Sequence, residues 1–414
     1  MATVEADEQA AGRSVPLAWR GGFGRLWGAA VVSRFGDALR GAALPLLAVS
    51  LTDSAVLVAL VTACGFLPWL LFGLLGGAIA DRVDQRRAMW AVDAARGVLM
   101  AAFAVAVWLG HASIGLLLAL AFALTTLQTL FDNAATALLP SVVPGEALSR
   151  ANARLMTGQE VMGRFVGAPL VPVALGLGIA MPYIADAVTY FAAAALVASL
   201  GGGARAPRRE PRAPGRTIRR DMGEGIKVLW RDRLLRALCV STTLCNIGIG
   251  ALIATLVLHI TGWLGAGDGG YAAVITAYGI GSVTGGLVAA RVAERLGRAP
   301  TIMVCGLVQI AALLALGTIR TLPAAVAALG VFGFAGIIWN VTEVTMMQQR
   351  SPAEMLGRVS AAFRTLSIAG SPLGALLGGV IAAAWGLNTP ALAAAVLFAG
   401  GLVALVPGIR APIN

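Results

Sequence analysis

The stretch GAIADRVDQRR, residues 77–87, decides the fold of this chain, because the stretch GLVAARVAERL, which begins at residue 286, repeats its pattern at an offset of 209 (286 − 77). The matched residues are Gly77, Arg82 and Arg86 with Gly286, Arg291 and Arg295. A second pair, PGEALSR from residue 144 and PAEMLGR from residue 352, has nearly the same offset of 208 (352 − 144). Two similar segments at nearly one offset predict that the chain is an internal duplication.

Around these segments the chain is strongly apolar. Of its 414 residues 58% are hydrophobic and only 12% are charged, which excludes a soluble protein. Runs of about 20 apolar residues, the length that crosses the hydrocarbon core, predict twelve transmembrane helices in two pseudo-symmetric six-helix bundles, an all-α integral membrane fold. The expected spans are 25–50, 54–80, 87–109, 112–138, 155–176, 179–201, 234–259, 271–293, 300–319, 322–346, 359–385 and 388–408.

The polar segments divide the chain into five units. The expected units are an N-terminal tail (1–22), a first bundle (23–201), a linker (202–233), a second bundle (234–409) and a C-terminal end (410–414). The linker opens with the sequence GGGARAPRREPRAPGR and continues with apolar residues at helical spacing. Its second part is therefore either an amphipathic helix on the membrane surface or a solvated connector.

The basic residues indicate the orientation. Lys and Arg number 31 against 20 Asp and Glu, and they gather in the tail, the linker and alternate connections. By the positive-inside rule, the tail, the linker and both termini face the cytoplasm of a bacterial plasma membrane. The net charge of +11 then reflects topology and contact with anionic lipid, and no nucleic-acid partner is needed to explain it.

Enzymatic chemistry finds little support in the sequence. Lys227 follows Ile226, so no P-loop is present and hydrolysis of ATP by that motif is excluded. The four cysteines stand singly in apolar runs, and the two histidines have no partners at catalytic or metal-ligand spacing. We expect neither an enzyme nor a bound metal or cofactor.

Three motifs carry a resemblance to a known family. They are the loop of Gly77, Asp81, Arg82, Arg86 and Arg87, the segments SRFGDAL (33–39) and LTDSA (51–55), and ALLPSVVPGEALSRAN (137–152). Over nearly its whole length the chain resembles the major facilitator superfamily, and within it the macrolide-efflux and enterobactin-exporter-like branch of bacteria. The resemblance implies the major facilitator fold, with a substrate site between the bundles, and we expect a monomer.

The antiporter motif of the fifth span departs from the family pattern. Gly163, Gly167 and Pro169 are present, but Ala168 precedes the proline and the later glycines are missing. Its support for drug/proton antiport is weaker for that reason.

The resemblance gives the loop after the second span the role of a latch. Asp81 would pair with neighbouring helix ends and release as the bundles rock, with Asp93 and Arg96 completing the network. In the alternative interpretation, Arg82, Arg86 and Arg87 only fix the topology.

Asp37 is the most informative single residue, because it falls near the middle of the first span. A charge there costs about 2.5–3.5 kcal/mol on insertion scales, so it needs a water-lined face or a partner. Arg34 and Arg40 lie one turn away on either side. Asp37 either couples transport to protons by exchanging its partners or is half of a permanent ion pair. Two arginines for one carboxylate leave a surplus positive charge, which favours coupling.

Other polar residues and one tryptophan within the spans are weaker candidates for the cavity. They are Asp132, Asn133, Glu160, Arg164, Asn246, Trp339, Asn340, Glu343 and Arg364. Glu160 with Arg164 is expected to be a structural pair, and Glu343 with Arg364 its counterpart between two helices. Trp339 is either a cavity wall or core. We expect Asp186 at a helix start near the outer surface, with no function.

These features together predict a secondary transporter that exports small amphiphilic molecules, drugs or natural products, in exchange for protons. A siderophore exporter and a nutrient importer or uniporter of the same fold are the alternatives within transport. A sensor or scaffold that transports nothing is the alternative from another class.

Overall fold

The computed structural model describes residues 21–80, 84–143, 147–167, 170–200, 218–352 and 355–409, and this part of the chain contains helices and no strand. The first half consists of α2 (Gly22–Leu51), α3 (Ala55–Ala80), α4 (Gln85–Trp108), α5 (Ile114–Val142), α6 (Leu148–Glu160), the π-helix η2 (Val161–Gly167), α7 (Val171–Leu177) and α8 (Met181–Ala198). The second half consists of α9 (Ile218–Arg231), α10 (Arg233–Leu258), the π-helix η4 (His259–Trp263), α11 (Gly267–Leu296), α12 (Arg298–Thr318), α13 (Leu322–Arg350), α14 (Leu356–Ile368), α15 (Gly370–Trp385) and α16 (Thr389–Ile409).

Each of the twelve expected spans coincides with one helix or one interrupted helix, so the predicted fold class is confirmed. Nine helices in the described part are long and apolar enough to cross a membrane. The fifth span is divided into α6, η2 and α7, and the eleventh is divided at Ala369 into α14 and α15. The tenth runs four residues past its expected end at 346, because its last turn is polar and hydropathy alone does not detect it.

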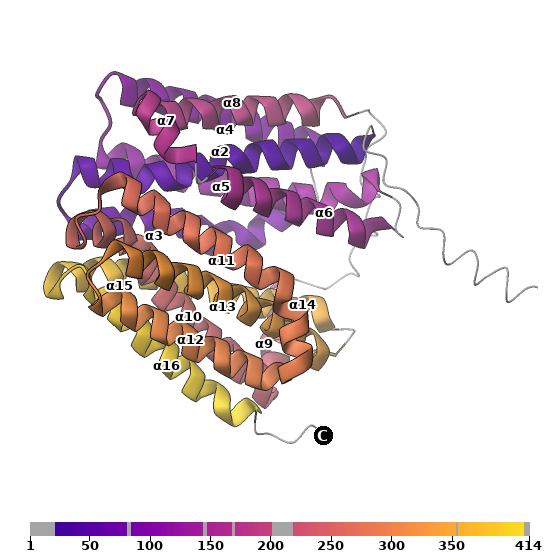
Figure 1. Ribbon diagram of the computed structural model, residues 1–414. Coiled ribbons are helices and arrows are strands. Elements are labelled where there is room, and N and C mark those ends of the chain that lie inside the picture. The colour runs from indigo at the N-terminus through magenta and orange to yellow at the C-terminus, as the bar shows by residue number, and fades with distance from the viewer. Residues whose placement is uncertain are drawn as a thin grey trace, which may run out of the picture.

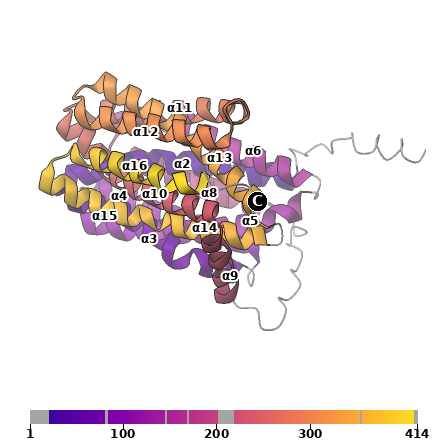
Figure 2. The ribbon, with the colours of Figure 1, turned by 90° about the horizontal axis from the view of Figure 1, so that it is seen from below.

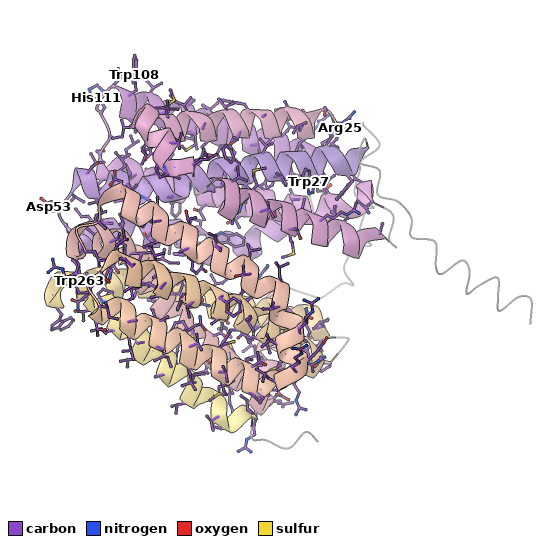
Figure 3. All side chains as sticks on the ribbon, in the orientation of Figure 1. Arg25, Trp27, Asp53, Trp108, His111 and Trp263 are labelled. Atoms are coloured by element: carbon purple, nitrogen blue, oxygen red, sulfur yellow. The ribbon has the colours of Figure 1, made fainter. Side chains whose placement is uncertain are left out.

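The helices form two bundles, α2–α8 and α10–α16, that touch at one end and spread apart toward the other (Figure 1). We call the end where α2 begins, α16 ends and α9 lies the linker side, and the opposite end the far side. Arg25 and Trp27 mark the linker side in Figure 3, whereas Asp53, Trp108 and His111 mark the far side.

Small residues make the contact of α3 with α10 and α15, which is the largest between the bundles. Ala59 and Ala63 of α3 form a buried cluster with Ala254 of α10 and Ala375 of α15. A Cβ added at Gly379 of α15 would lie 3.1 Å from the carbonyl oxygen of Ala55. These side chains let α3 and α15 approach closely on the far side. We call this contact the alanine seal.

Helix α9 is the structured part of the linker, and it packs against α14 (Figure 2). Arg358 of α14 donates to Glu224 at 2.6 Å, and Arg350 at the end of α13 donates to Asp232, just after α9, at 2.7 Å. Leu229 is buried, whereas Trp230 on the other face is exposed. The helix is therefore bound to the second bundle through one face.

Within the second bundle, helices approach each other at glycines. Gly281 of α11 lies against the backbone of α13 at Gly330 and Phe334. Gly250 of α10 and Gly374 of α15 make a similarly close approach between their helices. A side chain at these positions would meet backbone atoms, so only glycine allows the observed packing.

Candidate substrate cavity and buried charge cluster

A cavity of about 590 Å³ lies between the two bundles, and we call it the central cavity. Residues of α2, α3, α5, α6 and η2 line one wall, and residues of α10, α11 and α13 line the other. The charged residues among them, Arg34, Asp37 and Arg40, all come from α2. The opposite wall is apolar and aromatic, and it includes Ile249, Leu252, Ile253, Leu256, Tyr271, Tyr278 and Phe332.

A second cavity of about 220 Å³ adjoins the central one toward the linker side. It shares Arg34, Asp37 and Gln159 with the central cavity and adds Gln128 and Asp132 of α5. Asp37 therefore lies at the boundary between the two, where the carboxylate is within reach of both.

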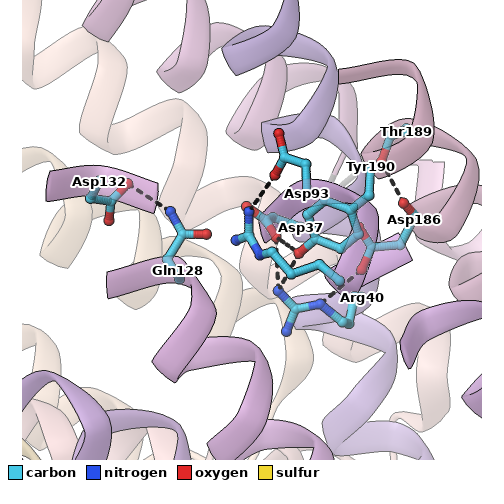
Figure 4. A network of polar contacts seen from close by, with 9 residues as sticks. Asp37, Arg40, Asp93, Gln128, Asp132, Asp186, Thr189 and Tyr190 are labelled. Atoms are coloured by element: carbon cyan, nitrogen blue, oxygen red, sulfur yellow. Dashed lines mark hydrogen bonds and ion pairs between the residues drawn. The ribbon is translucent and has the colours of Figure 1, made fainter. Parts of the chain in front are cut away.

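The Asp37 side chain is held by residues of two helices (Figure 4). Its Oδ1 accepts hydrogen bonds from Arg40 Nη2 at 2.8 Å and from the Tyr190 hydroxyl at 2.5 Å. Arg40 Nε donates in turn to Asp186 Oδ2 at 2.8 Å. One guanidinium group thus bridges two carboxylates, Asp37 on the cavity wall and the fully buried Asp186.

A second ion pair lies behind the first. Arg96 Nη1 donates to Asp93 Oδ1 at 2.9 Å, and both side chains are almost completely buried. The Arg96 guanidinium stacks on the Tyr190 ring, with its Cζ 4.4 Å from the ring centroid. Asp93 Oδ2 and Asp186 Oδ1 are buried and have no hydrogen-bond partner in the described part of the chain.

We call Asp37, Arg40, Asp93, Arg96, Asp186 and Tyr190 the charge cluster. It holds three carboxylates and two guanidinium groups, so it becomes electrically neutral on taking up one proton. Buried charges are costly unless they are paired, and this arithmetic makes the cluster suited to binding a proton.

Helical spacing and one glycine assemble the charge cluster. Asp186 and Tyr190 are four residues apart on α8, and Asp37 and Arg40 are three apart on α2, so each pair shares a helix face. A Cβ added at Gly36 would lie 2.9 Å from Asp186 Cα, which shows how closely α2 and α8 approach. This approach brings the two faces together.

The charge cluster bears on three expectations and corrects two of them. Asp186 does not lie at a helix start, because α8 begins at Met181, and its side chain is buried against α2. Asp93 and Arg96 contact each other and aromatic rings of the bundle; their expected part in a latch with Asp81 stays a prediction, because Asp81 lies outside the described residues. The surplus of positive charge at Asp37 is also wrong, because Arg40 is shared with a second carboxylate, Asp186.

The loop that resembled a latch is described only in part. Asp81 and Arg82 lie outside the described residues, as do the surroundings of Gly77. Arg86 donates to the carbonyls of Val197 and Ala198 and so caps the end of α8. Arg87 is 82% exposed and 3.9 Å from Asp84, which caps α4 by accepting from the backbone N–H of Arg87.

The antiporter motif of the fifth span coincides with the π-helix η2, a feature often found at functional sites. Gly163 lines the central cavity. A Cβ added at Gly167 would lie 2.7 Å from Ala38 Cβ, so this glycine allows η2 to lie against α2. Pro169 and the side chains of Glu160 and Arg164 lie outside the described residues.

The remaining candidates are only partly near the cavities. Asp132 lines the smaller cavity and accepts from Gln128 Nε2 at 2.7 Å, whereas the side chain of Asn133 lies outside the described residues. Asn246 Nδ2 donates to the Ser367 carbonyl at 2.9 Å and joins α10 to α14. Asn340 is exposed and does not line the central cavity.

Two expectations for the second bundle are resolved. Trp339 is core and not cavity wall, since it is 6% exposed and its ring packs against Gly306 of α12. Glu343 and Arg364 do not pair, because Arg364 is exposed and Glu343 is hydrogen-bonded to Thr242 of α10. The sequence alone did not identify Tyr190, Tyr278 and Phe332; the four-residue spacing of Tyr190 from Asp186 was the available signal for the first.

Comparison with known proteins gives the class. The profile of the Major Facilitator Superfamily matches residues 26–367 and 238–412. Over 371 residues the chain is 29% identical to the uncharacterized MFS-type transporter y4rN of Sinorhizobium fredii, covering 85% of this chain and 86% of that protein. Over 398 residues it is 26% identical to the multidrug efflux pump Tap of Mycobacterium tuberculosis, with 92% of each covered.

Solved structures agree on the fold. The nucleoside transporter NupG has a TM-score of 0.71 at 10% identity, covering 94% of this chain and 100% of that chain. A bacterial homolog of the human lysosomal transporter Spinster, in an inward-facing and occupied conformation, has a TM-score of 0.69 at 14% identity, covering 93% and 94%. The chain belongs to the major facilitator superfamily and is a multi-pass membrane transporter.

Proposed function

We propose that this transporter exports small amphiphilic organic molecules from a bacterial cell in exchange for protons. The observation that carries the proposal is the two-sided central cavity, with Asp37, Arg34 and Arg40 on one wall and aliphatic and aromatic side chains on the other. Such a cavity fits a molecule with one polar or charged end and an apolar body. The similarity to the efflux pump Tap supports export.

Asp37 is the residue we propose for coupling. When it binds a proton, its attraction to Arg40 weakens, and Arg40 remains paired with Asp186. Asp37 can then exchange between a proton and a polar group of the substrate, so that one is released as the other binds. The alternative is a permanent Asp37–Arg40 ion pair, which would leave transport independent of the protonation of Asp37.

We further propose that the linker side faces the cytoplasm, since the basic connections lie at that end of the spans. The bundles spread apart on the linker side and touch at the alanine seal on the far side (Figure 1). The conformation would then be open to the cytoplasm, ready to take up a substrate for export.

The composition of the cavity wall supports export of amphiphiles over uptake of sugars. Gln159 is the single side-chain amide among the described lining residues, whereas sugar sites generally require several hydrogen-bonding side chains. The likeness to NupG concerns the fold and does not extend to nucleosides. A sensor or scaffold would leave the cavity and its buried charges without a role.

The test uses everted membrane vesicles with an imposed pH gradient and the fluorescent organic cation ethidium. We expect gradient-driven uptake by the wild type and at least a tenfold loss in Asp37→Asn, which keeps the side-chain shape but cannot titrate. Asp268→Asn is the matched control, because Asp268 is exposed at the start of α11. Unchanged uptake in Asp37→Asn would exclude Asp37 as the coupling residue, and uptake without a gradient would indicate a uniporter.

A further inference from the structure

The second bundle contains a buried carboxyl group that the proposed mechanism does not use. Glu343 of α13 is 2% exposed, and in the described part of the chain it forms no ion pair with any Arg, Lys or His. One hydrogen-bond partner is the hydroxyl of Thr242 on α10. A buried carboxylate normally requires a cation, and Glu343 has none among the described residues; its neutral donors are the Thr242 hydroxyl and the indole N–H of Trp339.

The contact with Thr242 is one that a protonated carboxyl group can make. Thr242 Oγ1 also lies 2.9 Å from the carbonyl oxygen of Leu238, one turn earlier in α10, as threonine hydroxyls in helices commonly do. A hydroxyl has one proton, and a carbonyl oxygen can only accept. If the hydroxyl donates to Leu238, the hydrogen bond between Thr242 and Glu343 requires a proton on the carboxyl group, which then donates to Oγ1.

The surroundings of Glu343 contain no charge that would oppose a neutral carboxylic acid. The titratable groups that face it are the thiols of Cys239 and Cys245 on α10, both buried and uncharged as thiols. Trp339, one turn earlier in α13, is buried and uncharged, and its indole N–H donates to the Glu343 carboxyl group. Arg364 of α14 is exposed and makes no ion pair with Glu343.

We propose that Glu343 is a proton-binding site of the second bundle, occupied in this conformation and separate from the charge cluster around Asp37. The proposal rests on the geometry of Glu343 and Thr242 and does not depend on the direction of transport or on its substrate. It implies that the transporter holds a proton in each bundle when the charge cluster is also neutral.

The test is infrared spectroscopy of the purified full-length protein in lipid, recorded at neutral pH. A protonated carboxylic acid has a C=O stretching band that a carboxylate lacks. We expect subtraction of the Glu343→Gln spectrum from that of the wild type to leave one such band. The matched control, Glu294→Gln, changes an exposed glutamate on α11 and is expected to leave no band.

A second variant covers the case in which Glu343→Gln does not fold. Thr242→Val removes the hydroxyl and keeps the carboxyl group, so the same band should remain but shift to the frequency of an acid without a hydrogen bond. Asp37→Asn should keep the Glu343 band even if it abolishes transport, which separates the two proposals. The proposal is overturned if Glu343→Gln retains every carboxylic-acid band of the wild type and Thr242→Val shifts none of them. That result would show that Glu343 is ionised.

Discussion

The two bundles share a fold and differ in what holds their helices together. In the first bundle, α2, α4 and α8 meet through the charge cluster, in which Arg40 joins Asp37 to Asp186. In the second bundle, α11 meets α13 and α10 meets α15 at glycines, through direct backbone approach. In the described part of the second bundle, the ion pairs join Glu224 and Asp232 of the linker region to α14 and α13, and none joins the interiors of two membrane-spanning helices.

This difference separates two tasks within one duplicated fold. The charged side chains that line the central cavity belong to the first bundle, where they lie close enough to respond to each other. Close packing at glycines does not change when a proton or a charged substrate binds, because it depends on the shape of the helices alone. The first bundle is suited to coupling, and the second offers the substrate a firm apolar surface.

The largest expected effect tests the charges of the first bundle. Arg40→Leu leaves Asp37 and Asp186 without their shared cation, and breaking a buried pair in this way costs about 3–5 kcal/mol. We expect a marked fall in the thermal unfolding temperature of the detergent-solubilised protein. Arg34→Leu is the control, since Arg34 is exposed and makes no ion pair in the described part. Equal losses in both variants would contradict the bridging role of Arg40.

The next effect tests the glycine packing of the second bundle. In Gly281→Ala the added methyl group would meet the backbone of α13, including the Phe334 nitrogen at 3.1 Å, and overpacking of this kind costs about 1–3 kcal/mol. Gly41→Ala in the first bundle adds a methyl group where no atom lies within 4 Å. The unfolding temperature should fall in the first variant and stay level or rise in the second. The reverse order would refute the contrast between the bundles.

A smaller effect sharpens the account of the charge cluster. Tyr190→Phe removes the hydroxyl that donates to Asp37 and keeps the ring under Arg96, so we expect a loss of about 0.5–1.5 kcal/mol. Tyr183→Phe is a close control, because the Tyr183 hydroxyl is buried without a partner in the described part of the chain. Its removal should be neutral or stabilising. Unfolding of both variants in the same detergent gives the comparison.

The smallest effect concerns α9, outside the membrane-spanning helices. Glu224→Gln weakens the pair with Arg358, whose side chains are 39% and 22% exposed, so the loss should stay below about 1 kcal/mol. The difference from the wild type should shrink further at high salt, because exposed charges are screened. If Glu224→Gln lowered the stability as much as Arg40→Leu, exposed ion pairs would stabilise the second bundle as strongly as buried ion pairs stabilise the first.

The sequence predicted the helices well because the membrane imposes their length. All twelve expected spans match helices, since about 20 apolar residues are needed wherever the chain crosses lipid. The interruptions at η2 and at Ala369 were not predicted, because hydropathy reports how apolar a segment is and not whether its hydrogen bonds shift register.

The site was predicted in part, for a physical reason that its residues illustrate. Asp37 stood out because a charge inside an apolar run is costly, and Arg40 was found because it lies on the same helix face. The pairing of Asp186 was missed because its partner is 146 residues away, and one sequence does not say which faces of two distant helices meet. For the same reason the sequence did not decide between cavity wall and core for Trp339, since its neighbour Gly306 belongs to another helix.

The alanine seal has a consequence for how the far side opens. Ala59, Ala63, Ala254 and Ala375 present only methyl groups, and no hydrogen bond or ion pair of the described residues joins α3 to α10 or α15 there. Parting these surfaces breaks no polar bond, so the obstacle is the entry of water between walls that repel it. Hydrophobic constrictions of this type gate channels by drying. The far side of this transporter would open when water enters between these walls. A hydroxyl group introduced at one of these alanines would let water enter while the seal should be closed.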